Sequence, residues 1–215
     1  MSAPVATQKP RWRGVIHQVA SGVALVAGAL LVAWAPSRRG AVAAAIYSAS
    51  LTFLFSVSAL YHRRTWSPRA RPWMRRLDHS AIFVLIAGTY SPFCMRLPPA
   101  HERTLLLVVW GGAALGIVQS MVWVRAPKVV IAAIYVALGW CVLPFFHSMR
   151  QVISARELWL LAAGGVAYSA GAIVYALRRP DPSPAVFGYH EIFHALTIVA
   201  SGCHFAAVIE VVGRE

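Results

Sequence analysis

Long runs of apolar residues without charges constrain this chain more than any other feature of its sequence. Several of them reach about 20 residues, the length at which an α-helix crosses the roughly 30 Å hydrocarbon core of a bilayer. The composition agrees, since 59% of the residues are hydrophobic and 13% are charged, whereas soluble domains carry about 25% charged residues. A backbone inside the membrane must satisfy its own hydrogen bonds, so runs of this length predict helices. We therefore expect an all-α integral membrane protein.

The apolar runs predict seven transmembrane helices in a single bundle. The expected spans are 15–35, 41–61, 80–97, 104–124, 129–146, 158–177 and 187–212, separated by short breaks rich in Pro, Gly and Arg. Pro92 and Pro144 fall late in their spans and predict a kink or an end there. The loops are too short for a separate soluble domain. We expect a short cytoplasmic segment over 1–14, one membrane domain over 15–212 and a tail over 213–215.

The distribution of basic residues predicts the orientation of the bundle. The formal net charge of +13 would suggest nucleic-acid binding in a soluble protein, but here the 20 Lys and Arg lie mainly in short loops between the spans. Thirteen of them lie on the side of the N-terminus, and six of these are in the loop between the second and third spans. Because cytoplasmic loops are enriched in Lys and Arg, we expect a multi-pass cell-membrane protein with a cytoplasmic N-terminus, an external C-terminus and no nucleic-acid partner.

Polar side chains at the ends of three spans are the candidate functional residues, because burying a polar group without a partner costs several kcal/mol. Ser58 and His62 are four residues apart, hence on one face of the second span. Asp78 opens the third span, and His190 and His194 open the seventh. The predicted topology brings all five to the cytoplasmic end at one depth. It does not fix their lateral distances.

Three histidines at one depth predict a zinc site. Zinc binds neutral imidazole nitrogens, and catalytic sites combine three protein ligands with an open position for water. His62, His190 and His194 are the expected ligands, and zinc would activate the water. Asp78 is expected to hold or deprotonate that water. Ser58 is expected either to support the ligands or to donate to an oxyanion.

Each of these residues taken alone also fits a structural role. Two histidines at i and i+4 can be separately hydrogen-bonded, and His62 can be interfacial. Ser58 can bond its own helix backbone, and Asp78 can cap a helix or pair with an arginine. The stretch 190–194 also matches H-E-x-x-H, the motif of zinc proteases, in which Glu191 would be the general base.

Other polar residues are expected to lack a role in the chemistry. His204 lies fourteen residues after His190, about 21 Å along a helix, so we expect it to make a helix contact instead. Histidines near span ends are expected to be interfacial, and cysteines without C-x-x-C spacing to be structural thiols. These residues are His17, His79, His101 and His147, and Cys94, Cys141 and Cys203.

Three stretches carry a resemblance to a known family. They are Ser58-x-x-x-His62, the run from Arg76-Leu77-Asp78-His79-Ser80 to Gly88-Thr89-Tyr90-Ser91-Pro92, and Phe187-Gly188-Tyr189-His190-Glu191-Ile192-Phe193-His194 with Cys203-His204-Phe205. With the seven-span layout, they make the chain resemble the hemolysin III family, the bacterial branch of the progestin and adipoQ (adiponectin) receptors, which is related to the alkaline ceramidases. The resemblance implies a seven-helix bundle with zinc on His62, His190 and His194, and with Asp78 and Ser58 beside the metal-bound water.

The resemblance also implies a function in membrane lipid chemistry. The first expectation is a zinc-dependent hydrolase of a lipid amide, similar to a ceramidase, with Asp78 as base. The second is a membrane protein without enzymatic activity that carries a structural zinc, either a sensor of membrane lipids or a cytolytic factor. The third is an intramembrane protease that uses Glu191. In the first two cases we expect membrane lipids or a lipid-like ligand as partners.

Overall fold

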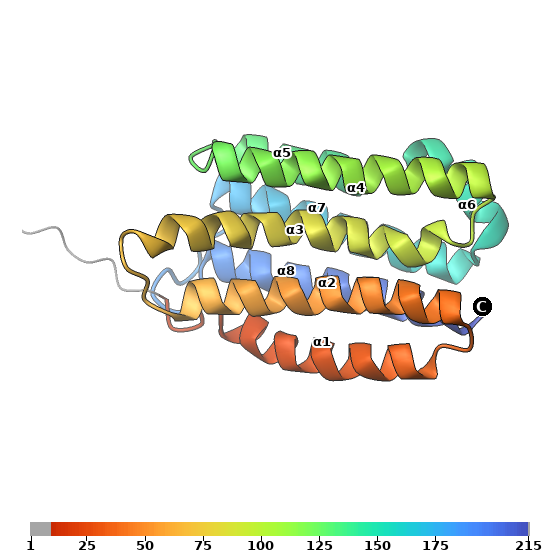
Figure 1. Cartoon of the computed structure of the whole chain (residues 1–215). Helices are drawn as coiled ribbons and strands as arrows, with labels where there is room; N and C mark the ends of the chain where they lie inside the picture. Colours follow the sequence, from red (N-terminus) through yellow and green to blue (C-terminus); the bar gives the residue numbers. More distant parts are fainter. Residues whose placement is uncertain (1–9, 215) are drawn as a thin grey trace, which may run out of the picture.

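Long helices lying side by side make up the protein, as the computed structural model shows for residues 10–214 (Figure 1). The predicted N-terminal segment over 1–14 therefore falls mostly outside the described residues, as does Glu215 at the end of the predicted tail. The helices are α1 (Val15–Trp34), α2 (Arg38–Arg63), α3 (Ala70–Cys94), α4 (Pro99–Val122), α5 (Lys128–Gly139), η1 (Leu143–Phe145), α6 (Phe146–Val152), α7 (Ala155–Leu177) and α8 (Tyr189–Gly213).

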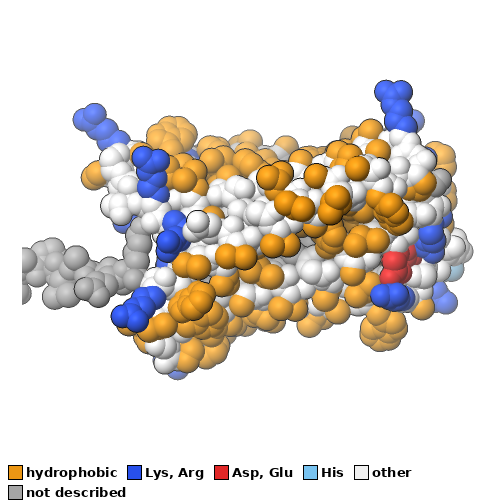
Figure 2. Space-filling view, turned by 90° about the horizontal axis from the view of Figure 1, so that it is seen from below, with side chains coloured by type: hydrophobic (Ala, Val, Ile, Leu, Met, Phe, Trp, Pro, Cys, Tyr) orange, Lys and Arg blue, Asp and Glu red, His pale blue; other side chains and the backbone are white. Residues whose placement is uncertain are grey.

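The surface of the bundle is that of a membrane protein. Six helical segments among the described residues are long and apolar enough to cross a bilayer, with α5, η1 and α6 together forming the segment Lys128–Val152. Hydrophobic side chains cover the middle of the face in Figure 2, and Lys and Arg side chains gather at its two ends. This distribution matches a bilayer core between two polar interfaces and confirms the predicted class of fold.

Helix α3 is the one long helix that falls outside the six apolar segments. Its predicted span was 80–97, but the helix begins ten residues earlier, at Ala70. The added turns carry Arg71, Arg75 and Arg76, which lower their hydropathy. Arginine is a good helix former, so the helix continues through this polar stretch. Over residues 10–214 the bundle thus has seven long helical segments, as predicted, and one of them is polar over its first turns.

The two prolines lie where the helices are interrupted. Pro92 is inside α3, two residues before its end at Cys94. Pro144 lies in η1, between α5 and α6. A proline ring removes a backbone donor and clashes with the preceding turn, so the fifth span is a short helix followed by a second helical piece. The predicted breaks at both positions are confirmed.

Helix α8 is the central element of the bundle. It packs most closely on α7 and also contacts α1, α2 and α3. Its buried face includes Thr197, Ala200, Ala207, Val208 and Val211. The first turn of α8 therefore lies among the ends of helices that are far apart in the sequence.

The segment before α1 lies against the loop between α7 and α8. The backbone amide of Arg11 donates to the carbonyl of Ala185 at 3.1 Å, and that of Trp12 to Val186 at 3.3 Å. These bonds hold the start of α1 close to the start of α8, at the end of the bundle where the loops α2–α3, α4–α5 and α7–α8 also lie (Figure 1).

Candidate metal centre

His62 lies in the last turn of α2, against the start of α1. Gly14 precedes α1 with φ of 77°, a left-handed conformation that other residues adopt at a cost. A Cβ at this position would lie 2.8 Å from the Cβ of His62. A glycine therefore allows α1 to begin directly beside His62.

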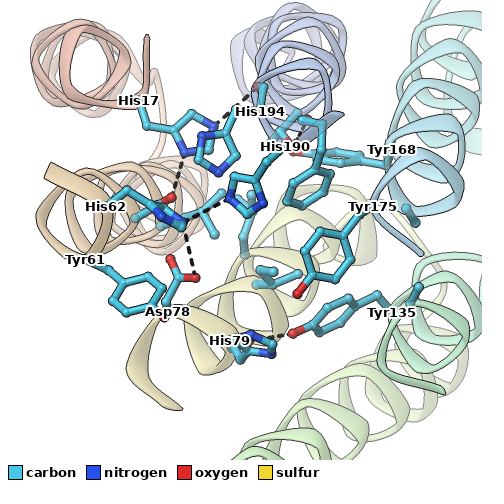
Figure 3. Close-up of a pocket in the computed structure, with 18 of the residues that line it drawn as sticks. His17, Tyr61, His62, Asp78, His79, Tyr135, Tyr168, Tyr175, His190 and His194 are labelled. Atoms are coloured by element: carbon cyan, nitrogen blue, oxygen red, sulfur yellow. Dashed lines mark hydrogen bonds and ion pairs between the residues drawn. The ribbon is translucent and has the colours of Figure 1, made fainter. Parts of the chain in front are cut away.

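His190 and His194 lie one turn apart on α8 and face His62 (Figure 3). The Nε2 atoms of His62 and His190 are 3.2 Å apart, and one ring nitrogen from each of the three histidines lies within 4.8 Å of the others. Two nitrogens bound to one tetrahedral zinc at 2.0–2.1 Å lie about 3.3 Å apart. The lateral proximity that the sequence left open is present, and the three side chains can hold a metal ion.

A missing hydrogen bond at one of the three histidines also fits a metal site. Nδ1 of His194 is buried and has no hydrogen-bond partner among the described residues. Buried imidazole nitrogens in proteins are normally hydrogen-bonded. An imidazole cluster with an unsatisfied nitrogen fits a ligand set for zinc.

Asp78 lies beside the three histidines. Its Oδ2 is 3.9 Å from Nε2 of His62, and both side chains line the same cavity. The expectation that Asp78 opens the third span was wrong, because α3 begins eight residues before it and Asp78 lies two turns inside the helix. Its depth nevertheless matches that of His62, because the preceding turns of α3 extend beyond the end of α2 (Figure 1).

Ser58 is connected to the histidines through His17, a residue that the sequence did not assign to the site. Nδ1 of His17 lies 2.8 Å from Oγ of Ser58, and Nε2 lies 3.3 Å from the carbonyl oxygen of His194. The His17 and His194 rings are stacked with their centroids 3.9 Å apart. The interfacial assignment of His17 was wrong, since the residue is only 2% exposed. Its position near the start of the first span, at the depth of the other five residues, was the available signal.

In a neutral imidazole one ring nitrogen donates and the other accepts. The partners of His17 therefore determine which of its two nitrogens is the donor. A carbonyl oxygen only accepts, so Nε2 of His17 carries the proton that it donates to His194. Nδ1 is then an acceptor, and the hydroxyl of Ser58 donates to it. The hydroxyl of Ser58 also lies within hydrogen-bond reach of the Asp78 carboxylate, so His17 and Asp78 are alternative acceptors for its single proton.

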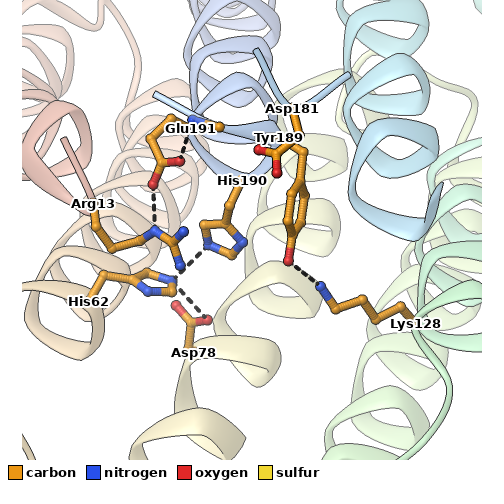
Figure 4. A network of polar contacts seen from close by, with 9 residues as sticks. Arg13, His62, Asp78, Lys128, Asp181, Tyr189, His190 and Glu191 are labelled. Atoms are coloured by element: carbon orange, nitrogen blue, oxygen red, sulfur yellow. Dashed lines mark hydrogen bonds and ion pairs between the residues drawn. The ribbon is translucent and has the colours of Figure 1, made fainter. Parts of the chain in front are cut away.

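The carboxylate of Glu191 is directed at Arg13 and not at His190 (Figure 4). Its carboxylate forms an ion pair with Arg13 and accepts a hydrogen bond from the backbone amide of Gly188 at 2.9 Å. Glu191 is fully buried, and these partners satisfy both of its oxygens. The residue caps the first turn of α8 and ties it to the segment before α1.

A cavity of about 810 Å³ extends from the histidines into the bundle. All five residues singled out in the sequence line it, as does His17. Tyr135, Tyr168 and Tyr175 from α5 and α7 line the side facing His62 and Asp78 (Figure 3). Further from the histidines the walls include apolar side chains, among them Leu85, Ile86 and Val136.

The remaining histidines and the cysteines have structural surroundings. Nε2 of His204 donates to the carbonyl oxygen of Leu161 at 3.2 Å, which confirms the predicted helix contact. His101 and His147 lie at the opposite end of the bundle and bond Ser148 and Gln151. His79 is half-buried and lines the cavity, so it was wrongly assigned to the interface alone. Cys94, Cys141 and Cys203 are free thiols, as predicted.

Comparison with known proteins agrees with this architecture. A family model described as Haemolysin-III related matches residues 5–205. The chain is 31% identical to a hemolysin-3 homolog of Bacillus subtilis, over 76% of this chain and 74% of the relative. It is also 31% identical to hemolysin-3 of Bacillus cereus, over 78% and 74%. The human monocyte to macrophage differentiation factor is 26% identical, over 86% and 76%.

The helices that can cross a bilayer and the bacterial relatives agree on a multi-pass protein of the cell membrane. The matched region includes every residue of the histidine cluster, the whole of α2 and the part of α8 up to residue 205. The chain belongs to the haemolysin-III related family.

Proposed function

We propose that this protein is a zinc-dependent hydrolase of a lipid amide. The observation that carries the proposal is the position of the His62–His190–His194 cluster and Asp78 at one end of a long cavity inside a membrane bundle. Three imidazoles are the ligand set of many catalytic zinc sites, which leave the fourth position for water. When bound there, zinc supplies a Lewis acid for the carbonyl and lowers the pKa of a coordinated water.

The length of the cavity suits an acyl chain. The cavity contacts α8 from His190 to His204, a separation of about 21 Å at 1.5 Å per residue. Half of the roughly 30 Å hydrocarbon core, the depth that an acyl chain spans in one leaflet, is about 15 Å. An acyl chain that extends along the cavity therefore places its carbonyl at the histidines.

Asp78 is the carboxylate best placed to receive a proton. It lies 3.9 Å from a metal-binding nitrogen and lines the cavity, so it can hold a water at the histidines and accept its proton. Glu191 has both oxygens engaged by Arg13 and Gly188, which argues against its use as the base of a protease. The hydrogen bond from Ser58 to His17 favours a supporting role for Ser58 over donation to an oxyanion.

The test is release of fatty acid from a panel of lipid amides by purified protein loaded with zinc. We expect Asp78→Asn to lose turnover while it retains zinc. Asp181→Asn is the matched control, because Asp181 also lines the cavity and its remaining amide oxygen still accepts from the Tyr189 amide. Equal turnover by Asp78→Asn and wild type would remove the proposed role of Asp78. A zinc-loaded protein that hydrolyses none of the amides would favour the alternative, a membrane-lipid sensor or lytic factor with a structural zinc.

A further inference from the structure

Basic side chains surround the cavity at the end where the histidines lie. Five of them contribute to its lining, namely Arg13, Arg64, Arg71, Arg75 and Lys128. They come from the segment before α1, the end of α2, the first turns of α3 and the start of α5. The acidic side chains that line the cavity are Asp78 and Asp181. This end of the cavity, which we call the basic mouth, therefore carries an excess of positive charge.

Two of these cations are held by neighbouring side chains. Arg13 is neutralised by Glu191. Lys128 donates to the hydroxyl of Tyr189 at 3.0 Å (Figure 4). It also lies over the ring of Tyr175, 4.2 Å from the ring centroid. An ammonium group has three donors, so the bond to Tyr189 leaves Lys128 further donors at the basic mouth.

Arg71 and Arg75 are not held in this way, although Arg75 is near enough to Asp78 to interact with its charge. Within residues 10–214, neither forms a salt bridge with a carboxylate. Arg71 is exposed and Arg75 is half-buried, and both line the cavity. Positive-inside orientation explains why arginines lie at this end of the bundle. It does not require them to line a cavity. Arg125, in the neighbouring α4–α5 loop, lies at the same end of the bundle and does not line the cavity.

We propose that the basic mouth binds a phosphate group carried by the head of the amphiphile whose acyl chain fills the cavity. The inference rests on the proposed function in one respect, that the cavity holds an acyl chain. Guanidinium groups match phosphate oxygens in a bidentate geometry, and the low-dielectric walls of a cleft strengthen the field of its charges. The order along the cavity is then phosphate at Arg71, Arg75 and Lys128, amide carbonyl at the histidines, and acyl chain between the apolar walls.

The experiment compares two ligands that differ only in the phosphate. An N-acylethanolamine and its O-phosphate with the same acyl chain are titrated calorimetrically into the protein in a neutral detergent. Asp78→Asn protein is used so that the result does not depend on turnover. We expect the phosphate to bind at least about tenfold more tightly, as charge-assisted bonds to two cations would give. We also expect the preference to fall at 1 M salt, where the Debye length is about 3 Å.

Charge variants identify the residues that confer the preference. We expect Arg71→Glu and Arg75→Gln each to reduce it severalfold without changing the affinity for the neutral ligand, and Arg75→Lys to restore part of it. Arg125→Glu makes the same change of charge as Arg71→Glu on an exposed residue outside the cavity, and it should leave the preference intact. Equal affinities of wild-type protein for the two ligands would overturn the inference, as would a preference that Arg71→Glu and Arg75→Gln leave unchanged.

Two further results separate the sources of the phosphate and the two proposals. Inorganic phosphate that binds alone and abolishes the preference at millimolar concentration would assign the site to a free anion and overturn the lipid assignment. A phosphate preference in a protein that hydrolyses no amide would support this inference while the proposed hydrolase fails. Amide hydrolysis without a phosphate preference would support the proposed hydrolase and overturn this inference.

Discussion

The imidazole of His17 lies between the histidine cluster and Ser58. It stacks on His194 at 3.9 Å, donates to the carbonyl of the same residue and accepts from Ser58. Partners of metal ligands fix the orientation of the ligand ring. The carbonyl bond additionally ties α1 to the first turns of α8. His17 thus holds the ring of His194 in its position within the histidine cluster.

We expect His17→Ala to lower the zinc affinity about 10- to 100-fold, the usual effect of removing a group that orients a metal ligand. Competition with a chromogenic chelator measures the affinity. His147→Ala, an exposed histidine at the opposite end of the bundle, is the control and should bind zinc as the wild type does. A His17→Ala protein with wild-type affinity would show that His194 keeps its orientation without the stacked ring.

At the scale of helices, the close contact of α7 with α8 positions His190 and His194. This contact includes Gly164, which faces the ring of His204. A Cβ at position 164 would lie 2.3 Å from two atoms of that ring and 3.1 Å from the carbonyl of Ala200. Small residues at such positions let membrane helices approach closely.

We therefore expect Gly164→Ala to push the two helices apart and to lower the melting temperature of the purified protein by several degrees. Gly202→Ala is the matched control, because a Cβ at that position meets no atom within 4 Å. Alanine favours a helix over glycine by about 1 kcal/mol, so the control should be at least as stable as the wild type. Thermal unfolding in detergent measures both. Equal melting temperatures of the two variants would contradict the packing described for α7 and α8.

The sequence predicted the helices where apolar runs alone define them, and failed where polar residues continue a helix. Six predicted spans begin within five residues of the observed helices, because lipid imposes both their length and their composition. The first turns of α3 were missed because Arg71, Arg75 and Arg76 resemble a loop in hydropathy while they favour a helix in conformation. Depth along the membrane normal was predictable in the same way, and it brought together Ser58, His62 and the pair on α8.

Lateral packing was the part of the site that the sequence left open. His17 was missed because nothing in its own helix distinguishes it from an interfacial histidine; its role depends on α8, 177 positions away in the chain. The role of Glu191 was likewise not visible in its own helix, because its partner Arg13 lies before the first helix. Contacts between helices that are distant in sequence follow from the whole bundle and not from any local pattern.

At the scale of the whole molecule, the protein is a bundle with an apolar middle and basic ends (Figure 2). The histidine cluster and the basic mouth share the end that carries the α2–α3 and α7–α8 loops (Figure 1). The positive-inside rule predicts that this end faces the cytoplasm. The cavity is then entered from the inner side of the membrane.

Single cysteines at opposite ends of the bundle test this orientation. Pro68 lies in the α2–α3 loop and Gln151 in α6, and both are exposed. On intact cells, a membrane-impermeant maleimide is expected to label Gln151→Cys and to label Pro68→Cys only after the cells are opened. The unmodified protein, whose three thiols are buried or half-buried, gives the background. Labelling of Pro68→Cys on intact cells would place the histidines on the outer side.

Metal analysis of the purified protein tests the central claim, that His62, His190 and His194 hold a zinc ion, most directly. The account predicts about one zinc per chain in the wild type and a large loss of zinc in His62→Ala, His190→Ala and His194→Ala. His204→Ala removes a histidine from the same helix as His190 and His194, outside the cluster, and should retain the metal. A wild-type protein without near-stoichiometric zinc, or a triad variant that keeps it, would contradict the account.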